Sequence, residues 1–182
     1  PLKLEENIPM WETPFKYFTL SSYKSWKDVN EWAQGVFALE TNPDLEDVFQ
    51  EVFVGNETTE QKISKLIDYV QDDIRYMGIE SGIGSIKPFD PEQVVKQRFG
   101  DCKDKSLLLV WLLKNIGVEE AYPALVNTIK QGELDKYLVS NQVFNHCIVK
   151  FEHNDTTYWV DPTNVMQGGD YNELYTENYG KA

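Results

Sequence analysis

The sequence feature that most constrains the fold is a block of seven successive apolar residues, 107–113, directly after the polar stretch 100–106. A helix with no polar face must be surrounded by protein on nearly all sides. Asp101 is a good N-cap for this helix, and Asp104 places a carboxylate in its first turn. Gly117 can end it in the left-handed conformation. The sequence therefore predicts a buried central helix.

Cys102 is expected at the first position of this helix. The partial positive charge of the helix N-terminus, together with Lys103, Lys105 and Arg98, favours the thiolate, which is the nucleophilic form of cysteine. Cysteine is also among the most buried residue types, so a thiol that only packs in the core is the alternative. The local sequence leaves both interpretations open.

Size and charge limit the classes of function. The chain has 182 residues, 41% of them hydrophobic, which suits one domain with a substantial core. A formal net charge of −13 and the lack of a basic stripe argue against a nucleic acid partner. No apolar run approaches the ~20 residues of a spanning helix, and no signal peptide is seen, so direct membrane insertion is not expected. The chain begins at Pro1 without Met, and we expect a segment of a longer protein.

The amino-terminal part is predicted to be mainly helical. Residues 1–21 carry aromatic side chains without a sustained period and are expected to be a lead-in or linker from a preceding domain. Residues 75–84, rich in glycine, are expected to form a loop. Three further helices are predicted from their N-terminal signals. These signals are the capping boxes Ser25/Asp28 and Thr58/Gln61 and the pair Asp90–Pro91.

After Gly117 the pattern changes from helical to extended. Residues 121–126 form a compact apolar run, and residues 143–151 and 156–161 are two extended segments joined by a turn signal. Helices that precede strands in this way are typical of an α+β domain. The sequence thus predicts a helical first part, with the buried cysteine-bearing helix, followed by an antiparallel sheet.

The predicted hairpin brings an imidazole and a carboxylate together. A two-residue turn after His153 would set Asp161 diagonal to His146, within side-chain reach, and a longer turn would set them directly opposite. Side chains alternate faces along a strand, so Cys147 faces away from His146 and is expected in the core. A disulfide between Cys147 and Cys102 is therefore disfavoured.

These residues supply the three roles of a nucleophilic catalyst. A cysteine nucleophile needs a base, and the base needs a group on its other nitrogen that fixes its tautomer. Cys102, His146 and Asp161 are the candidates for these roles. The alternative for His146 is an ordinary half-buried strand histidine, and His153 is expected to be solvated in the turn.

Three segments together resemble one known family. Arg-Phe-Gly-Asp-Cys-Lys-Asp-Lys at 98–105, Phe-Asn-His at 144–146 and Trp-Val-Asp-Pro-Thr at 159–163 are similar to the transglutaminase-like superfamily, which has a papain-type fold. The resemblance covers about residues 22–165. It is closest to a bacterial branch in which this domain follows a β-rich domain in a larger exported protein. It implies a transglutaminase-like domain over 22–182, truncated at its carboxyl end because the family continues with more strands.

The resemblance also implies an activity. It assigns Cys102 as nucleophile, His146 as general base and acid, and Asp161 as orienting carboxylate in acyl transfer on protein or peptide amides through a thioester. Peptidase, amidase and transglutaminase activity all remain open. The expected oxyanion donors are the Cys102 backbone N–H and, as a candidate, Tyr76, for which plain packing is equally compatible.

Other expectations follow from the resemblance alone. No metal or cofactor is expected, the partners are a protein or peptide substrate and other domains of the parent chain, and the location is extracytoplasmic. A non-catalytic protein-binding module with the same fold is the main alternative function. Amide hydrolysis on a glycan-linked asparagine or a cell-wall peptide is a third.

Overall fold

The computed structural model describes residues 20–78 and 86–182. Nearly all of the predicted lead-in over 1–21, and most of the predicted loop over 75–84, therefore lie outside the described residues. The helices are α1 (Trp26–Val36), α2 (Glu46–Val52), α3 (Thr59–Asp68), which continues as the π-helix η1 (Tyr69–Asp73), α4 (Pro91–Gln97) and α5 (Cys102–Asn115), with the short 3₁₀-helices η3 (Gln131–Lys136) and η4 (Asn141–Val143).

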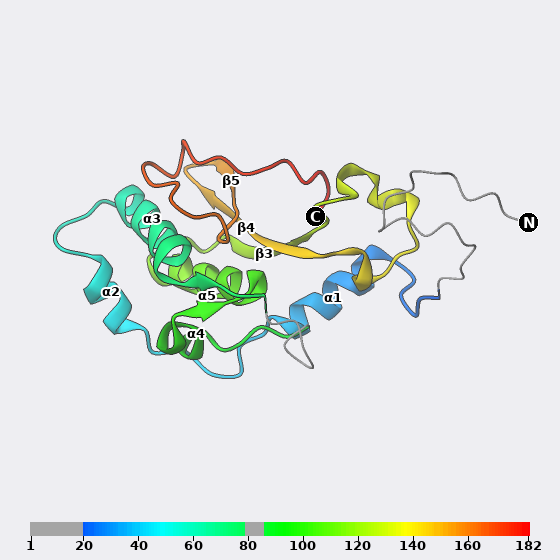
Figure 1. The fold of residues 1–182 in the computed structure, drawn as a ribbon, viewed down its shortest axis with the longest axis horizontal. Helices are drawn as coiled ribbons and strands as arrows, with labels where there is room; N and C mark the ends of the chain where they lie inside the picture. The colour runs from blue at the N-terminus through cyan, green and yellow to red at the C-terminus, as the bar shows by residue number, and fades with distance from the viewer. Residues whose placement is uncertain (1–19, 79–85) are drawn as a thin grey trace, which may run out of the picture.

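The strands form two small sheets. β3 (Ala121–Val126), β4 (His146–His153) and β5 (Thr156–Val160) make an antiparallel sheet in that order. β1 (Arg75–Tyr76) pairs in parallel with β2 (Phe99–Gly100). The predicted α+β order of helices before the main sheet is confirmed (Figure 1). The start of the predicted loop is instead strand β1, because its backbone pairs with the chain that leads into α5.

Helix α5 is the centre of the fold, as its apolar block predicts. Every residue from 102 to 113 is buried. The helix packs against β3 and β4 on one side and against α3, η1 and α4 on others. Its first turn has the predicted capping box between Asp101 and Asp104, and its end is followed by Gly117 at φ +93°. The helix start is thereby fixed both by capping and by burial.

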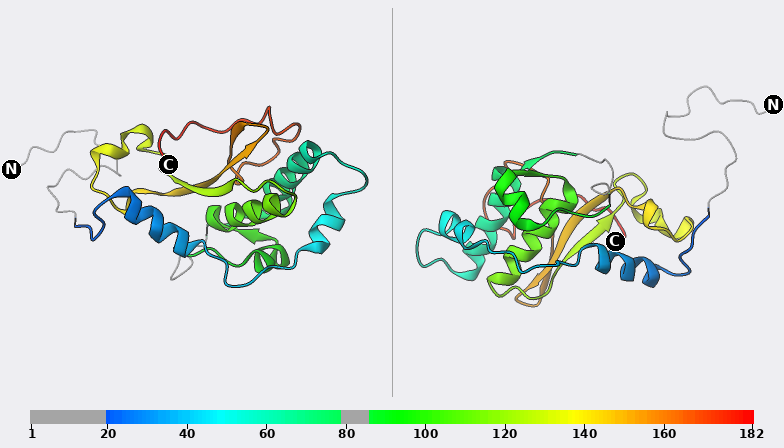
Figure 2. Two further views of the ribbon diagram at one scale, coloured as in Figure 1. Left: turned by 180° about the vertical axis from the view of Figure 1, so that it is seen from behind. Right: turned by 90° about the horizontal axis from the view of Figure 1, so that it is seen from below.

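The other predicted helix signals are also confirmed. Both capping boxes close, at the starts of α1 and α3, and Asp90 caps α4 with Pro91 in its first turn. α1 nevertheless differs from the rest, since Val29 is its one buried residue. It lies beside the sheet, apart from the helices that surround α5 (Figures 1 and 2).

The β4–β5 hairpin has a two-residue turn, which is one of the two turn lengths that the sequence left open. His153 pairs with Thr156, and Asn154 and Asp155 between them have φ values of +49° and +57°. Positive φ at both positions is the type I′ geometry, which matches the twist of a hairpin. Because Val160 pairs with Val149, the next residue of the chain leaves the sheet close to the start of β4.

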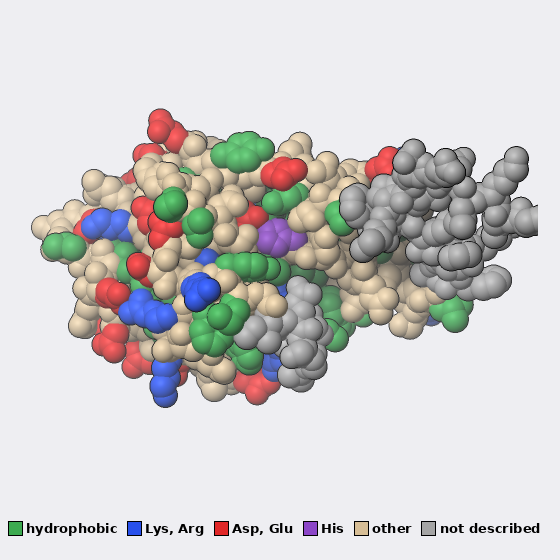
Figure 3. All heavy atoms as spheres, in the orientation of Figure 1, with side chains coloured by type: hydrophobic (Ala, Val, Ile, Leu, Met, Phe, Trp, Pro, Cys, Tyr) green, Lys and Arg blue, Asp and Glu red, His purple; other side chains and the backbone are tan. Residues whose placement is uncertain are grey.

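Among the described residues, no helix has both the length and the apolar character needed to cross a membrane. On the face shown in Figure 3, acidic side chains are scattered and the basic ones form no stripe.

The burial of α5 predicts a large effect of core truncation. Leu109 is fully buried, and we expect Leu109→Ala to lower the free energy of unfolding by about 2–5 kcal/mol through lost contacts and a cavity. Leu138→Ala is the control, because Leu138 is 48% exposed and its truncation should change stability by about 0.5 kcal/mol or less. Urea unfolding measures both variants. Equal effects would contradict the central position of α5.

Candidate active site

The thiol of Cys102 lies at the N-terminus of α5, where the sequence places it. Asp101 Oδ1 accepts hydrogen bonds from the backbone N–H groups of Lys103 at 2.8 Å and Asp104 at 3.2 Å. Asp104 Oδ2 accepts the N–H of Asp101 in return at 2.8 Å. The N–H of Cys102 itself has no acceptor among residues 20–78 and 86–182, as is usual for the first turn of a helix.

Gly100 is required by the same turn. A Cβ at this position would come within 2.6 Å of the Asp104 Cβ, which is closer than real side chains approach. The Asp104 carboxylate also holds the preceding loop, since its Oδ1 accepts the backbone N–H of Phe89 at 2.7 Å. The chain before Cys102 is therefore fixed from both sides.

His146 and Asp161 meet as the hairpin geometry predicts. His146 Nε2 lies 2.7 Å from Asp161 Oδ2, and both side chains are largely buried. His146 is the first residue of β4, and Asp161 directly follows β5. Because Asp161 takes Nε2, Nδ1 is the ring nitrogen left for Cys102.

The charges of these groups depend on one another. Burial alone lowers the pKa of His146, but hydrogen bonds with Asp161 and Cys102 outweigh burial and raise this pKa to about 9. Burial also raises the pKa of Asp161, but hydrogen bonds from His146 and Thr163 hold it below its usual range. The carboxylate is thus charged at neutral pH and favours the imidazolium form of His146.

Cys102 and His146 line the same cleft of about 450 Å³. Trp32 of α1, Phe37 just after that helix, and Lys103 also line the cleft. The cleft therefore exposes the thiol and the imidazole to one space, although Cys102 itself is only 4% exposed.

The cations that the sequence places around Cys102 are engaged with other groups. Lys103 Nζ lies 2.5 Å from Asp101 Oδ2, and Arg98 pairs with Glu51 at 2.9 Å. Lys105 is fully buried, and its ammonium group donates to the backbone carbonyls of Gln71 and Ile74. The helix N-terminus and His146 therefore remain as the positively charged groups beside Cys102 that have no other cation-specific partner than Asp161.

Two further residues hold the Asp161 carboxylate, and sequence reasoning missed both. The N–H and hydroxyl of Thr163 donate to Asp161 Oδ1 at 2.9 and 2.6 Å. The Tyr179 hydroxyl donates to Oδ2 at 3.1 Å, and its ring makes an edge contact with His146. Burial and the charge of Asp161 raise the pKa of Tyr179, so it stays a donor. Thr163 could have been found from the sequence, because it follows Asp161 by two residues in the Asp-Pro-Thr segment. No local sequence pattern relates Tyr179 to Asp161.

A buried polar network links α5 to Asp161 through the π-helix η1. Lys105 Nζ donates to the backbone carbonyls of Gln71 at 3.1 Å and Ile74 at 2.6 Å. The Gln71 side chain donates to the Asp161 carbonyl at 2.9 Å and to Gln167 Oε1 at 2.8 Å. Single-turn π-helices widen the backbone and often occur near functional sites. Here the wider turn supplies carbonyls to a buried ammonium.

The structure does not bring Tyr76 into the cleft. Its backbone pairs with Gly100, two residues before Cys102, but the side chain is 43% exposed and is not among the described residues that line the cleft. Its role as an oxyanion donor stays a prediction.

Cys147 lies in the core, as the strand alternation predicts. It is fully buried, burial raises the pKa of its thiol, and both cysteines are free. Its surroundings are those of a packed thiol and not of a reactive one.

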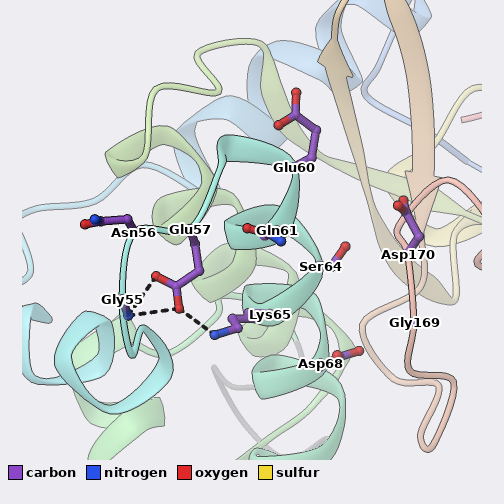
Figure 4. Close-up of a pocket in the computed structure, with 10 residues that line it drawn as sticks. All are labelled: Gly55, Asn56, Glu57, Glu60, Gln61, Ser64, Lys65, Asp68, Gly169 and Asp170. Atoms are coloured by element: carbon purple, nitrogen blue, oxygen red, sulfur yellow. Dashed lines mark hydrogen bonds and ion pairs between the residues drawn. The ribbon is translucent and has the colours of Figure 1, made fainter.

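A larger cavity lies away from the thiol. It measures about 680 Å³ and is formed by the turn at Gly55–Glu57, the exposed side of α3 and Gly169–Asp170 (Figure 4). Some of its polar side chains are already paired with each other, for example Glu57 with Lys65 at 2.6 Å. We place the candidate site in the smaller cleft because only that cleft contains a nucleophile with a base. Among the described residues, no group of three or more His, Cys, Asp and Glu side chains could hold a metal ion.

The fold and the thiol–imidazole cleft define the class as a cysteine-protease-type α+β domain. The family model of the transglutaminase-like superfamily matches residues 46–180, so the chain belongs to this superfamily. Comparison with curated proteins finds no match. A solved structure of a "putative protease" from Parabacteroides distasonis has the same fold, with a TM-score of 0.61 and 15% identity. The match covers 76% of this chain and 27% of that protein, so the chain spans about a quarter of its length.

The raised pKa of His146 predicts how stability depends on pH. Because the folded value of about 9 lies above the ordinary 6.5, the stabilisation by charged His146 is fully present below pH 6.5 and is lost as pH rises through about 9. Asp161→Asn removes the main charge that raises this pKa. We expect the His146 pKa, measured by NMR titration, to fall in this variant, and the loss of stability over that pH window to shrink. An unchanged His146 titration would contradict the assigned pair.

Lys105 predicts a pH dependence of opposite sign. Burial lowers its pKa to about 8 from 10.5, although Asp161 and Asp72 oppose this shift. The unfolded chain then binds the proton more tightly, so this group makes the free energy of unfolding rise between pH 8 and 10.5. Lys105→Met should lack that rise when both proteins are unfolded with urea across the window. The same slope in both proteins would show that Lys105 keeps an ordinary pKa.

Proposed function

We propose that this domain catalyses acyl transfer on protein or peptide amides, with Cys102 as nucleophile, His146 as general base and acid and Asp161 as the orienting carboxylate. The observation that carries the proposal is the 2.7 Å contact between His146 and Asp161 in the cleft that also contains the thiol of Cys102. The superfamily membership and the protease named as a structural neighbour support an amide as the substrate class.

The first half of the reaction forms a thioester. The Cys102 sulfur attacks the amide carbonyl carbon while the imidazolium of His146 holds the proton that the thiol has given up. As the tetrahedral intermediate collapses, the C–N bond breaks and His146 gives this proton to the leaving amine or ammonia. Asp161 keeps its negative charge throughout and stabilises the imidazolium.

The oxyanion of the intermediate has one donor built into the fold. The Cys102 N–H lies at the helix N-terminus and is not used by any described acceptor, so it can donate to the developing charge. Tyr76 is our candidate for the second donor, because its backbone pairs with Gly100; its side chain is not among the described ones that line the cleft and would have to turn toward it to donate. A donor of this kind contributes ~2.7–4 kcal/mol to the transition state.

The second half of the reaction releases the acyl group. Water or an amine attacks the thioester carbonyl, His146 takes the proton of the attacking group, and the C–S bond breaks to return the thiolate. Water gives a peptidase or amidase, and an amine gives a transglutaminase. Both outcomes use the same residues.

The proposal predicts an unusual pH profile for alkylation of Cys102. In a Cys147→Ala background, we expect iodoacetamide to label Cys102 rapidly already at near-neutral pH, where His146 is charged and can hold the proton that the thiol has given up. His146→Ala should slow labelling at neutral pH by about ten-fold or more, because an ordinary thiol has a pKa of ~8.5 and is mostly protonated there. Stopped-flow labelling followed by mass spectrometry measures the rates.

Trapping of the acyl-enzyme tests catalysis directly. Incubation with a library of peptide amides should add an acyl mass to Cys102, and Cys102→Ala should abolish it. The opened amide then identifies the substrate. A normal thiol profile that His146→Ala leaves unchanged, with no acyl mass from any amide, would favour the non-catalytic binding module.

A further inference from the structure

A second groove adjoins the candidate active site. It has a volume of about 640 Å³ and lies between α1 and the outer side of β3. Leu125 and Phe144 line both this groove and the cleft that contains Cys102, so the two spaces are neighbours that share walls. The groove therefore leads away from the thiol along β3.

Helix α1 forms one wall of both spaces. Trp26, Val29 and Ala33 line the groove, and Trp32, on the same helix, lines the cleft. Trp26 is fixed there by an edge contact with Phe144. α1 also lies outside residues 46–180, which match the family model, so this wall is not part of the matched family core.

The other wall is one face of the main sheet, where Lys150 of β4 and Trp159 of β5 lie beside β3, together with the free edge of the sheet at β3. β3 is an edge strand, because the order of the sheet is β3-β4-β5. The carbonyls of Glu120 and Val126 accept hydrogen bonds from the chain of β4 and its flank. Backbone groups alternate sides along an antiparallel strand, so those of Pro123 and Leu125 point outward. Proline at an outward position fits, since it has no N–H to donate.

These outward groups have no partner in the part of the chain that the structure describes. The N–H and carbonyl of Leu125 and the carbonyl of Pro123 take part in no hydrogen bond with the described residues. They face the groove that Pro123, Ala124 and Leu125 line. An edge with unpaired backbone groups beside a groove is the arrangement that takes up an extended peptide as an added strand.

The side chains of the groove indicate the chemistry of the occupant. Aliphatic and aromatic side chains predominate, and the charged ones are Lys27, Lys150, Lys181 and Asp135, in a chain with a net charge of −13. Each of the three lysines is paired with a carboxylate, so the groove has no strong positive potential. The groove also lacks the excess of negative charge that the chain as a whole has. An apolar peptide without excess positive charge fits best.

We infer that an extended apolar segment of the substrate polypeptide binds between α1 and β3 as an added strand that pairs with Leu125, and so presents its amide to Cys102. This inference rests on the proposed function and specifies its substrate as an unfolded or extended polypeptide. A small amide or a folded surface would leave the groove empty.

Peptide-linked alkylating probes test the inference. An iodoacetyl group is attached to the amino-terminal or the carboxyl-terminal end of an extended apolar hexapeptide, and labelling of Cys102 is compared with that by iodoacetamide. At least one probe should label about ten-fold faster, the gain expected from one or two net hydrogen bonds and apolar contact. If neither probe gains over iodoacetamide, the inference is wrong.

N-methylation separates strand addition from simple apolar contact. Two versions of the faster probe are methylated on alternate backbone amides, one at the odd positions and one at the even positions. Because a strand pairs with a single edge through alternate residues, one version should lose the gain and the other keep it. Equal behaviour of the two versions would overturn pairing with β3.

Variants in α1 test the position of the peptide. Ala33→Trp fills the groove and should lower the ratio of the probe rate to the iodoacetamide rate, whereas Gln34→Trp, on the exposed side of the same helix, should not. Equal ratios in both variants would place the peptide elsewhere. Fast iodoacetamide labelling that depends on His146, without any gain for the peptides, would refute this inference alone and leave the proposed function standing.

Discussion

The burial of α5 is the constraint on which the rest of the structure depends. A helix whose residues are buried from Cys102 to Leu113 must be covered on all sides, and α3, α4, η1, β3 and β4 provide that cover. Its N-terminus cannot shift without disturbing these contacts. The Asp101–Asp104 capping box and the close approach at Gly100 then fix the direction in which the first residue points. The position of the thiol is thus a consequence of core packing.

Polar groups in the interior connect this helix to the hairpin that carries His146 and Asp161. Lys105, one turn after Cys102, binds carbonyls at η1, and Gln71 in η1 binds the carbonyl of Asp161. Buried polar groups are costly unless they have partners, so each contact restricts the positions of the others. The network explains how a helix start and a strand end, far apart in the sequence, are held in a common geometry.

Helix α1 has a different relation to the fold. It contributes one buried side chain, and it lies beside the sheet, where it walls the cleft and the groove next to it. The matched family core begins after it, at residue 46. An element that adds little to the core but borders the candidate site can change with less cost to the fold than a core helix can, and its side chains are therefore suited to set selectivity.

The sequence by itself determined the elements whose signals are local. The apolar block at 107–113, the capping boxes and the hairpin turn signal each specify local conformation, so the buried helix and the approach of His146 to Asp161 were predicted, while the choice between two registers was left to the structure. The tertiary structure decided what depends on distant segments. Tyr179 and Gln71 reach Asp161 from elements that no spacing rule relates to it, β1 forms by pairing with a chain segment over twenty residues away, and the predicted cations find partners other than Cys102. Such contacts arise from the path of the whole chain, which a local pattern does not contain.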